Sequence, residues 1–438
     1  MSSYDFTVPT LGKTTVHSPI ALSKRNDDLM ANYVCDDEFI IYDVSAVPGK
    51  QVTYNRKSLI EKAGPREFIY FDPSKVRAGI VTCGGLCPGL NDVIRAIVMT
   101  LWYQYGVRSI TGIRFGYQGL LPVNGYDTVE LNPKVVGEIH RMGGTILGSA
   151  RGGGNQTGEL VDSIERMNLS LFFTIGGDGT QRGANDIAEE ILKRKQKISV
   201  VGIPKTIDND LSFIQKSFGF ETAVGKAVEA VAGAHVEAHD AINGIGIVKV
   251  MGRESGFIAA HTALANNDVN YVLIPEVPFD LDGERGLLRH LAERLKRRNH
   301  AVIVVAEGAG QELLQALEMN DASGNKKLGD IGTYLKERIR EFFKNENVAI
   351  NLKYIDPSYI IRSTPANPND SIYCNRLGTN AAHAAMAGKT KTLMSLINNT
   401  FVHVPMDLAV SKRNRIDPES PLWRDVIQAT GQPALLKN

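Results

Sequence analysis

The sequence contains no apolar run of about 18 residues, the length that a membrane-spanning helix needs. Its N-terminal residues lack a basic segment followed by an apolar run, so they predict no secretory signal peptide. Only four cysteines occur, and Cys83 and Cys87 are spaced CxxxC without a second pair, which fits reduced thiols better than zinc ligands. The net charge is +1, so no global field attracts nucleic acid or an anionic membrane. These absences predict a cytoplasmic protein that binds neither nucleic acid nor a membrane.

Glycine, by contrast, is abundant, with 42 residues that concentrate after apolar segments. The run Gly176-Gly177-Asp178-Gly179-Thr180 follows an apolar segment at 169–175 and precedes a helical pattern at 182–195. Glycines at such a turn let backbone N–H groups approach phosphate oxygens, and the start of a helix adds a positive dipole end. Asp178 is suited to hold Mg²⁺ against a phosphate chain. The plainer alternative is a structural turn in which Asp178 caps the helix.

A second run, Pro204-Lys205-Thr206-Ile207-Asp208-Asn209-Asp210, follows the apolar segment 198–203. Asp208 is suited to take a proton from a hydroxyl that attacks phosphorus. Taken alone, its two aspartates could equally form an Asx-turn or a helix cap. Because both runs follow neighbouring predicted strands of one βαβ unit, together they predict phosphoryl transfer to an alcohol.

Further segments repeat the order of strand, glycine turn and helix. Predicted strands at 77–82 and 109–115 run into glycine-rich turns, and Arg151 stands among glycines at 145–154, where it could clamp a phosphate. In the second half, apolar segments at 244–250, 271–274, 301–306 and 352–355 predict strands, and 222–239 and 371–392 predict helices. This alternation predicts an α/β protein with a doubly wound, mostly parallel sheet and ligands at the carboxyl ends of the strands.

These runs, taken in order, resemble the 6-phosphofructokinases, which phosphorylate fructose 6-phosphate at its 1-hydroxyl. The shared segments are GGLCPGLN, GYQG, SAR, GGDGT, PKTIDND, KVMGR, AEG and YIIR, and they cover about residues 77–390. NAD kinases and lipid kinases share only GGDGT. The resemblance implies two doubly wound domains with mostly parallel sheets, a donor-binding domain at 76–220, completed by part of 365–400, and a sugar-phosphate-binding domain at 221–364. Residues 1–75 are then predicted as an N-terminal arm and 400–438 as a C-terminal extension.

The resemblance also implies roles for individual residues. Asp208 would be the general base, Arg253 would stabilise the transferred phosphoryl group, and Asp178 would bind Mg²⁺. The donor ATP would be bound by Gly85, Arg151, Gly152, Gly176, Gly177, Asp178, Gly179 and Thr180. The sugar phosphate would be bound by Thr206, Ile207, Asp208, Asp210, Met251, Gly252, Arg253, Glu307, Tyr359, Ile360, Ile361 and Arg362. The family further implies a homo-oligomer, either a dimer or a tetramer.

Two residues bear on the choice of phosphate donor. In this family, glycine after the GGD aspartate leaves space for the α-phosphate of a nucleotide, and Gly179 stands there. Lysine before TIDND is typical of pyrophosphate-dependent members, and Lys205 stands there. The mixed pair resembles an atypical ATP-dependent group and favours ATP, with pyrophosphate as the alternative. A non-catalytic regulatory subunit of the same fold is a weaker alternative, because Asp178, Asp208 and Arg253 are all present.

The 6-phosphate site departs from the family pattern. Tyr359 stands where the family often has histidine, and Lys353 and Gly244 stand where it often has arginine. Lysine and arginine bind phosphate differently. At these three positions the sequence therefore differs from the family in the groups that would bind the sugar phosphate.

Overall fold

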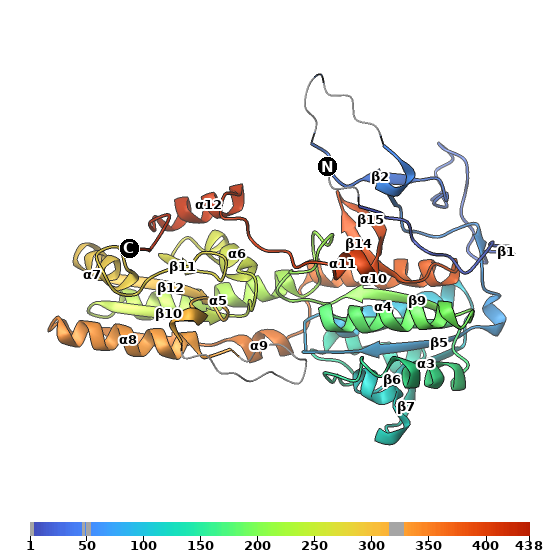
Figure 1. Ribbon diagram of the computed structural model, residues 1–438, viewed down its shortest axis with the longest axis horizontal. Helices are drawn as coiled ribbons and strands as arrows, with labels where there is room; N and C mark the ends of the chain where they lie inside the picture. Colours follow the sequence, from blue (N-terminus) through green and yellow to red (C-terminus); the bar gives the residue numbers. More distant parts are fainter. Residues whose placement is uncertain (1–3, 46–48, 50–53, 315–327) are drawn as a thin grey trace. The chain divides into compact units, whose positions relative to one another are not determined.

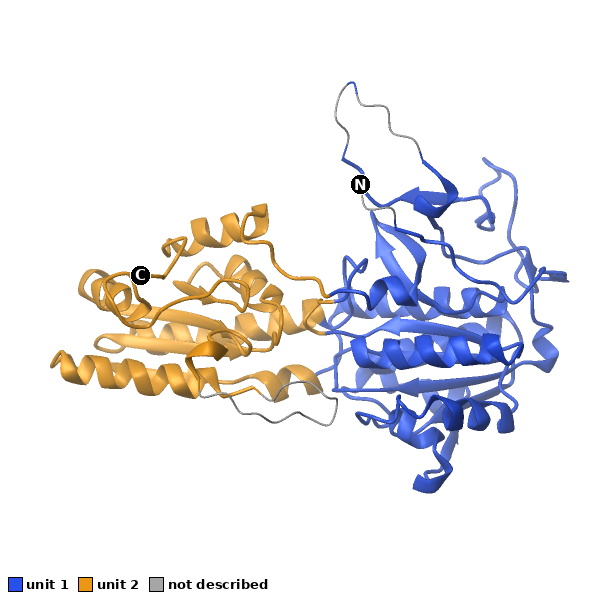
Figure 2. Ribbon diagram, in the orientation of Figure 1, with its two compact units in different colours: residues 1–206, 211–219, 364–412 blue, residues 207–210, 220–363, 413–438 orange. Residues whose placement is uncertain are grey.

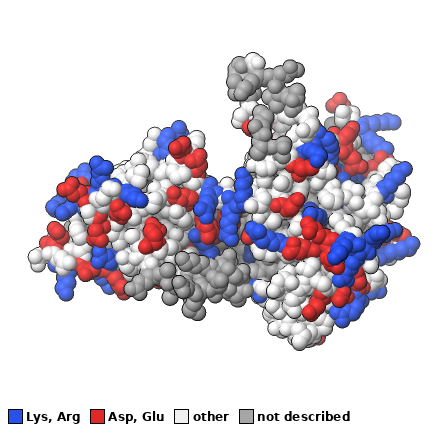
Figure 3. All heavy atoms as spheres, in the orientation of Figure 1, with Lys and Arg blue, Asp and Glu red and all other residues white. Residues whose placement is uncertain are grey.

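The computed structural model describes residues 4–45, 49, 54–314 and 328–438, which form two compact units (Figures 1 and 2). Unit 1 comprises residues 1–206, 211–219 and 364–412, and unit 2 comprises 207–210, 220–363 and 413–438. On the visible face, acidic and basic side chains are interspersed over each unit, in keeping with the net charge of +1 (Figure 3). Among the described helices, none has both the length and the apolar character to cross a membrane.

A seven-stranded sheet forms the centre of unit 1. Its strands, in spatial order, are β15 (Thr400–Pro405), β14 (Thr392–Ile397), β9 (Ser199–Pro204), β8 (Leu171–Gly176), β5 (Arg77–Thr82), β6 (Ser109–Ile113) and β7 (Thr128–Glu130). The five inner strands are parallel, and β7 and β15 are antiparallel edges. Every residue of β8 and β9 is buried, as expected for parallel strands covered on both faces.

The order of the strands reverses direction at β5. The chain passes from β5 to β6 on one side and then returns to β8 on the other side of β5. At such a reversal the loops after the two strands diverge and leave room for a ligand at their carboxyl ends. The glycine turns after β5 and β8 both lie at this edge.

The helices of unit 1 surround its sheet. They are α1 (Leu90–Met99), which continues as a π-helical segment Thr100–Gln104, α2 (Pro133–Val136), α3 (Thr157–Arg166), α4 (Asp178–Lys193), α10 (Pro368–Met386) and α11 (Met406–Ala409). The predicted helix at 371–392 was wrong at its end. It stops at Met386 because Gly388 has a φ of +73°, and Thr392 already begins β14.

The N-terminal residues add two short ribbons to unit 1. β1 (Val16–His17) pairs with β4 (Phe68–Ile69), and β2 (Phe39–Ile41) pairs with β3 (Leu59–Glu61). The chain after β3 contacts the sheet edge, where the Ala63 N–H donates to the Phe401 carbonyl at 2.8 Å. This segment is therefore held on unit 1 by backbone hydrogen bonds as well as by side chains.

Unit 2 contains a four-stranded parallel sheet in the order β11 (Tyr271–Leu273), β12 (His300–Ala306), β10 (Gly244–Val250), β13 (Asn351–Ile355). Its helices are α5 (Phe220–His239), α6 (Phe257–Ala265), α7 (Leu287–Arg298), α8 (Ile331–Asn345), α9 (Ser358–Ser363) and α12 (Pro421–Thr430). Val302 and Val304 pack in one core with α5, α6 and α12, and Ile303 and Val305 pack in another with α7 and α8. Alternate residues of β12 thus face different helical layers.

Both sheets confirm the predicted α/β, mostly parallel class. The compact units divide the chain differently from the predicted ranges. The N-terminal residues predicted as a separate arm group with unit 1, and residues 207–210 group with unit 2. The predicted extension at 400–438 divides, so that β15 and α11 belong to unit 1 and 413–438 to unit 2. As statements about which substrate each domain binds, the ranges stay predictions.

Candidate active site

The predicted donor residues gather at the carboxyl edge of the sheet in unit 1. After β5, the Gly84 N–H donates to the Ala150 carbonyl at 2.9 Å, and the Ser149 hydroxyl donates to the Gly84 carbonyl at 2.6 Å. These bonds join the GGLCPG and SAR segments. Arg151 is exposed, and its Nη2 lies 3.8 Å from the position that a Cβ on Gly85 would take. Gly152 follows it, exposed and with a φ of +82°.

The GGDGT run forms the junction of β8 and α4. The predicted helix at 182–195 begins earlier than expected, at Asp178, so Asp178, Gly179 and Thr180 form the first turn of a 16-residue helix. A Cβ on Gly176 would lie 2.2 Å from the Thr180 hydroxyl, so glycine is required there. The Thr180 carbonyl in turn accepts from the Tyr117 hydroxyl at 2.7 Å. These contacts fix the first turn of α4, whose backbone N–H groups could stabilise an anion.

Lys205 connects the two glycine turns. Its side chain is buried, and Nζ donates to the Gly85 carbonyl at 2.6 Å. Its backbone N–H donates to the Gly176 carbonyl at 2.9 Å, and a Cβ on Gly177 would lie 3.1 Å from the Lys205 carbonyl. A cation is thereby placed among glycines of both turns. Gly179, in contrast, borders open space, with no heavy atom within 4 Å of a Cβ built on it.

Asp178 lies at the start of α4 with its side chain 19% exposed. Its Oδ2 is 3.1 Å from Nε of Arg182, whose Nη2 donates to the Val410 carbonyl at 2.9 Å. In the described part of the chain, no group of three His, Cys, Asp or Glu side chains could hold a metal ion. A single protein carboxylate is nevertheless often enough to hold Mg²⁺ on a phosphate chain, because phosphate oxygens and water molecules supply the other ligands of the octahedral ion. Asp178 therefore fits Mg²⁺ that arrives with a phosphate ligand.

In unit 2, the segment 207–210 brings Asp208 close to the loops that follow β10 and β12. The Ser255 hydroxyl donates to the Asp208 carbonyl at 3.2 Å. Among the described residues, Oδ1 of Asp208 is buried and has no hydrogen-bond partner. Burial and the charges of Asp210 and Glu307 raise the pKa of Asp208 to about 7, against the opposing effects of the Arg253 backbone N–H and the charge of Arg362. A carboxylate with such a pKa can accept a proton near neutral pH.

The predicted residues after β10 and β12 are locked together by backbone bonds. The Glu307 N–H donates to the Val250 carbonyl and the Gly308 N–H to the Gly252 carbonyl, both at 2.9 Å. Gly252 has a φ of +130°, and a Cβ on Gly308 would lie 1.9 Å from the Arg253 carbonyl. The glycines of MGR and AEG are therefore needed for the close approach of the two loops. Met251 is buried, and its Sδ accepts from Nε of Arg362 at 3.3 Å.

The four residues of YIIR differ in exposure. Tyr359 is 81% and Ile360 67% exposed, Arg362 is half-buried, and Ile361 is fully buried in the core that contains Met251. The Ile361 side chain is thus a packing group, and a contact with a ligand would use its backbone. Arg362 is the residue of α9 that the structure brings to Met251 and Asp208.

Sequence reasoning missed several residues beside these sites. Arg182 pairs with Asp178, and Arg413 pairs with Asp210 at 3.2 Å. The i,i+4 spacing of an acid and a base could have revealed Arg182. No local signal could have revealed Arg413, because it lies 203 residues from its partner in the chain.

Comparison with known proteins identifies the family. A family model described as phosphofructokinase matches residues 77–385. The chain belongs to the phosphofructokinase family. The match spans both units and includes every residue predicted for the donor and sugar-phosphate sites, whereas Arg413 lies beyond it.

Relatives within the phosphofructokinase family align with nearly the whole chain. A protein from Borreliella burgdorferi named ATP-dependent 6-phosphofructokinase is 56% identical, over 99% of this chain and 98% of its own length. One of the same name from Amycolatopsis methanolica is 46% identical, over 98% and 95%. Among solved structures, a pyrophosphate-dependent phosphofructokinase from Marinobacter aquaeolei aligns with a TM-score of 0.66 and 20% identity, over 81% of this chain and 91% of that one. At this identity the structural likeness concerns the fold alone.

Proposed function

We propose that the protein is an ATP-dependent 6-phosphofructokinase that phosphorylates the 1-hydroxyl of fructose 6-phosphate. The observation that carries the proposal is Asp208, a buried carboxylate with an unpartnered Oδ1 and a pKa raised to about 7. Relatives as similar as 56% in sequence carry the name ATP-dependent 6-phosphofructokinase. The named activity requires a base of this kind to act on a sugar hydroxyl.

In the proposed reaction, the 1-hydroxyl oxygen attacks the γ-phosphorus of ATP while Asp208 accepts the hydroxyl proton. The bond between the γ-phosphorus and the bridging oxygen breaks, and ADP leaves. Arg253 stabilises the charge on the transferred group, and Arg362 binds the 6-phosphate, with Glu307 accepting hydrogen bonds from the sugar. Positioning and fixed charges supply the catalysis, because the protein makes no covalent bond in such a transfer.

We propose that the phosphates of ATP bind at the first turn of α4 and the glycine turn after β5, where Arg151 and Lys205 provide positive charge. Mg²⁺ would be held by Asp178 together with phosphate oxygens, and it would neutralise charge on the phosphate chain. Arg182, which now pairs with Asp178, would keep a cation next to this carboxylate in the absence of the metal. The open space at Gly179 favours a nucleotide over pyrophosphate.

Pyrophosphate is the second candidate donor, and Lys205 is the observation that favours it. Its Nζ donates to the Gly85 carbonyl at 2.6 Å, which places the amino group at the glycine turn after β5. A cation in this position would serve the phosphates of either donor. We therefore rank the open space at Gly179 above the added charge, and ATP above pyrophosphate.

A donor assay on the purified protein tests the proposal. Fructose 6-phosphate and Mg²⁺ are supplied with either ATP or pyrophosphate, and fructose 1,6-bisphosphate is measured. We expect turnover with ATP alone. Turnover with pyrophosphate alone would mean that Lys205 outweighs the space at Gly179, and no turnover with either would favour a regulatory subunit. We further propose a cytoplasmic homo-oligomer, a dimer or a tetramer, which the mass of the purified protein in solution would test.

A further inference from the structure

The segment 413–416 follows the last residue of unit 1 and runs along the acidic loops of unit 2. Arg413 Nη1 lies 3.2 Å from Oδ2 of Asp210, and the Asn414 N–H donates to the Asp210 carbonyl at 2.8 Å. Arg415 forms an ion pair with Glu254, and the Ile416 N–H donates to Oε1 of Glu276 at 2.9 Å. These four successive residues thus contact three acidic residues of unit 2, namely Asp210, Glu254 and Glu276.

Glu276 joins this segment to the loop after β10. Its Oε1 accepts both from Ile416 and from the Gly256 N–H, the latter at 3.0 Å. Gly256 is the N-cap of α6, directly after Ser255, whose hydroxyl donates to the Asp208 carbonyl. The 413–416 segment therefore reaches the backbone of Asp208 through Glu276 as well as through Asp210.

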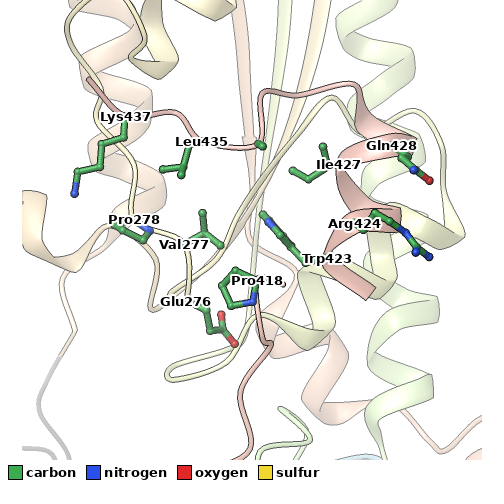
Figure 4. Close-up of a pocket in the computed structure, with 11 residues that line it drawn as sticks. Glu276, Val277, Pro278, Pro418, Trp423, Arg424, Ile427, Gln428, Leu435 and Lys437 are labelled. Atoms are coloured by element: carbon green, nitrogen blue, oxygen red, sulfur yellow. The ribbon is translucent and has the colours of Figure 1, made fainter. Parts of the chain in front are cut away.

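The remainder of the C-terminal region anchors the segment. Ile416, Trp423 and Val426 are buried in the same core as Met251 and Val250. Beyond α12, Gln432 pairs with the backbone of Val272 in β11, where its Oε1 accepts at 2.6 Å and its Nε2 donates at 3.3 Å. A cavity of about 740 Å³ separates part of this region from the loop 276–278, with Trp423 on one wall and Glu276 on another (Figure 4). The anchor is thus the core and the β11 edge.

Charge gives Arg413 a role beyond anchoring. After burial, the largest effects of charge on the pKa of Asp208 come from Asp210 and Glu307, which raise it, and from Arg362, which lowers it. Side chains of Arg413 and Asp210 are 28% and 11% exposed, so solvent screens their pair only partly. Arg413 opposes the negative charge of Asp210 at close range and thereby limits how far Asp210 disfavours the ionised form of Asp208.

We propose that Arg413 is a positioning residue of the reaction, which fixes Asp210 beside Asp208 and offsets the negative charge of Asp210. The inference rests on the proposed function, in which Asp208 is the base. Arg413 lies outside residues 77–385, which the family model matches.

The test compares Arg413→Met with Arg413→Lys. In Arg413→Met we expect kcat/KM at pH 7 to fall roughly tenfold for each unit by which the pKa of Asp208 rises. The deficit should narrow toward pH 9, where Asp208 ionises in either protein, and Arg413→Lys should restore much of the activity. Arg424→Met is the matched control, because Arg424 lies on the exposed surface of α12 and pairs there with its neighbour Asp425. A pH-independent deficit would reduce Arg413 to a structural role and overturn the proposal.

A second readout does not depend on turnover. If Arg413 affects the ionisation of Asp208, the stability that Arg413→Met loses relative to the wild type should increase between pH 6 and pH 9. The loss that Arg413→Met causes in Asp208→Asn, measured relative to Asp208→Asn itself, should not change with pH over this range. An increase that persists in the double variant would contradict the coupling. An inactive wild-type protein would refute the proposed function, while the stability comparison would still decide the role of Arg413.

Discussion

At the scale of single residues, the ionised carboxyl of Asp208 makes the folded protein less stable. The pKa of this carboxyl rises from 3.8 to about 7, with burial as the largest cause, followed by Asp210 and Glu307. Between these pH values the folded protein binds more protons than the unfolded one, so its stability falls as pH rises through this range. A charge needed for proton transfer is therefore retained at a cost in stability.

Asp208→Asn should consequently lose activity and gain stability. We expect turnover to fall by about 10²–10⁴-fold, the usual contribution of a positioned base. Unfolding stability at pH 8 should exceed that of the wild type by roughly 2–4 kcal/mol, because the carboxamide cannot ionise, and the advantage should shrink as pH falls toward 4. Turnover and denaturant unfolding at several pH values measure both effects.

The matched control is Asp186→Asn, which removes an exposed carboxylate from α4. It should leave both turnover and the pH dependence of stability close to those of the wild type. Near-normal turnover in Asp208→Asn would show that another group is the base. Equal stability gains at pH 4 and pH 8 would show that the charge of Asp208 is not their cause.

At the scale of elements, sequence patterns predicted strands better than helix ends. The predicted strands at 77–82 and 244–250 coincide with β5 and β10, because largely buried parallel strands form nearly continuous apolar runs in the sequence. The end of α10 was misplaced because the alanine-rich pattern of the helix continues to Ala387. The helix ends because Gly388 has a positive φ. The start of α4 was misplaced because two glycines hide the helical geometry of its first turn.

The same contrast holds for the site. Asp178, Asp208 and Arg253 stand in short runs directly after strands, where the chemistry can be read locally. Arg413 and Glu276 act through partners that are 203 and 140 residues away in the chain. Such contacts depend on how the C-terminal region crosses unit 2, and no local pattern encodes that path.

The first turn of α4 gives a prediction at this scale. Gly179→Asp should fold normally, because no heavy atom lies within 4 Å of the new Cβ and an acid in the first helical turn is favourable by about 0.3–1 kcal/mol. Its carboxylate would repel the phosphates of ATP, so KM for ATP should rise by at least about tenfold while KM for fructose 6-phosphate changes little. Initial-rate kinetics and the melting temperature check both statements.

Gly179→Ala is the matched control, because it adds the Cβ without the charge and should bind ATP much more normally. An unchanged KM for ATP in Gly179→Asp would place the donor phosphates elsewhere. Gly176 provides the opposite case within the same run, since a Cβ there would collide with Thr180. Glycine is thus needed at position 176 because a side chain would not fit there, whereas at position 179 we expect that glycine leaves space for the donor.

At the scale of the whole molecule, each unit is assembled from segments that are far apart in the chain. In unit 1, Glu61 of β3 lies 2.7 Å from Lys389, which follows α10, and 3.0 Å from Arg66. All three side chains are at least 90% buried. This ion cluster therefore fixes the N-terminal residues to the turn between α10 and β14.

The cluster makes stability depend on pH in the sense opposite to Asp208. Burial acts to raise the pKa of Glu61, but neighbouring cations outweigh it and lower the pKa to about 2. Burial also lowers the pKa of His403 to about 3, so near neutral pH the charged partners of Glu61 are Lys389 and Arg66. The stabilisation is thus present above the ordinary value of 4.5 and is lost as pH falls toward 2.

Glu61→Gln should therefore destabilise unit 1 at pH 7 by about 3 kcal/mol, because it removes the buried carboxylate that Lys389 and Arg66 share. The remaining carboxylate near both cations, that of Asp36, is largely exposed and lies 3.9 Å from Lys389. The difference from the wild type should narrow below pH 4.5, where Glu61 takes up a proton in the unfolded state while its pKa in the folded protein is about 2. Glu138→Gln removes a 75% exposed partner of Arg141 and should change stability by less than about 1 kcal/mol. If Glu61→Gln lost the same stability at pH 3 as at pH 7, the shape of the side chain rather than its charge would hold the N-terminal residues in place.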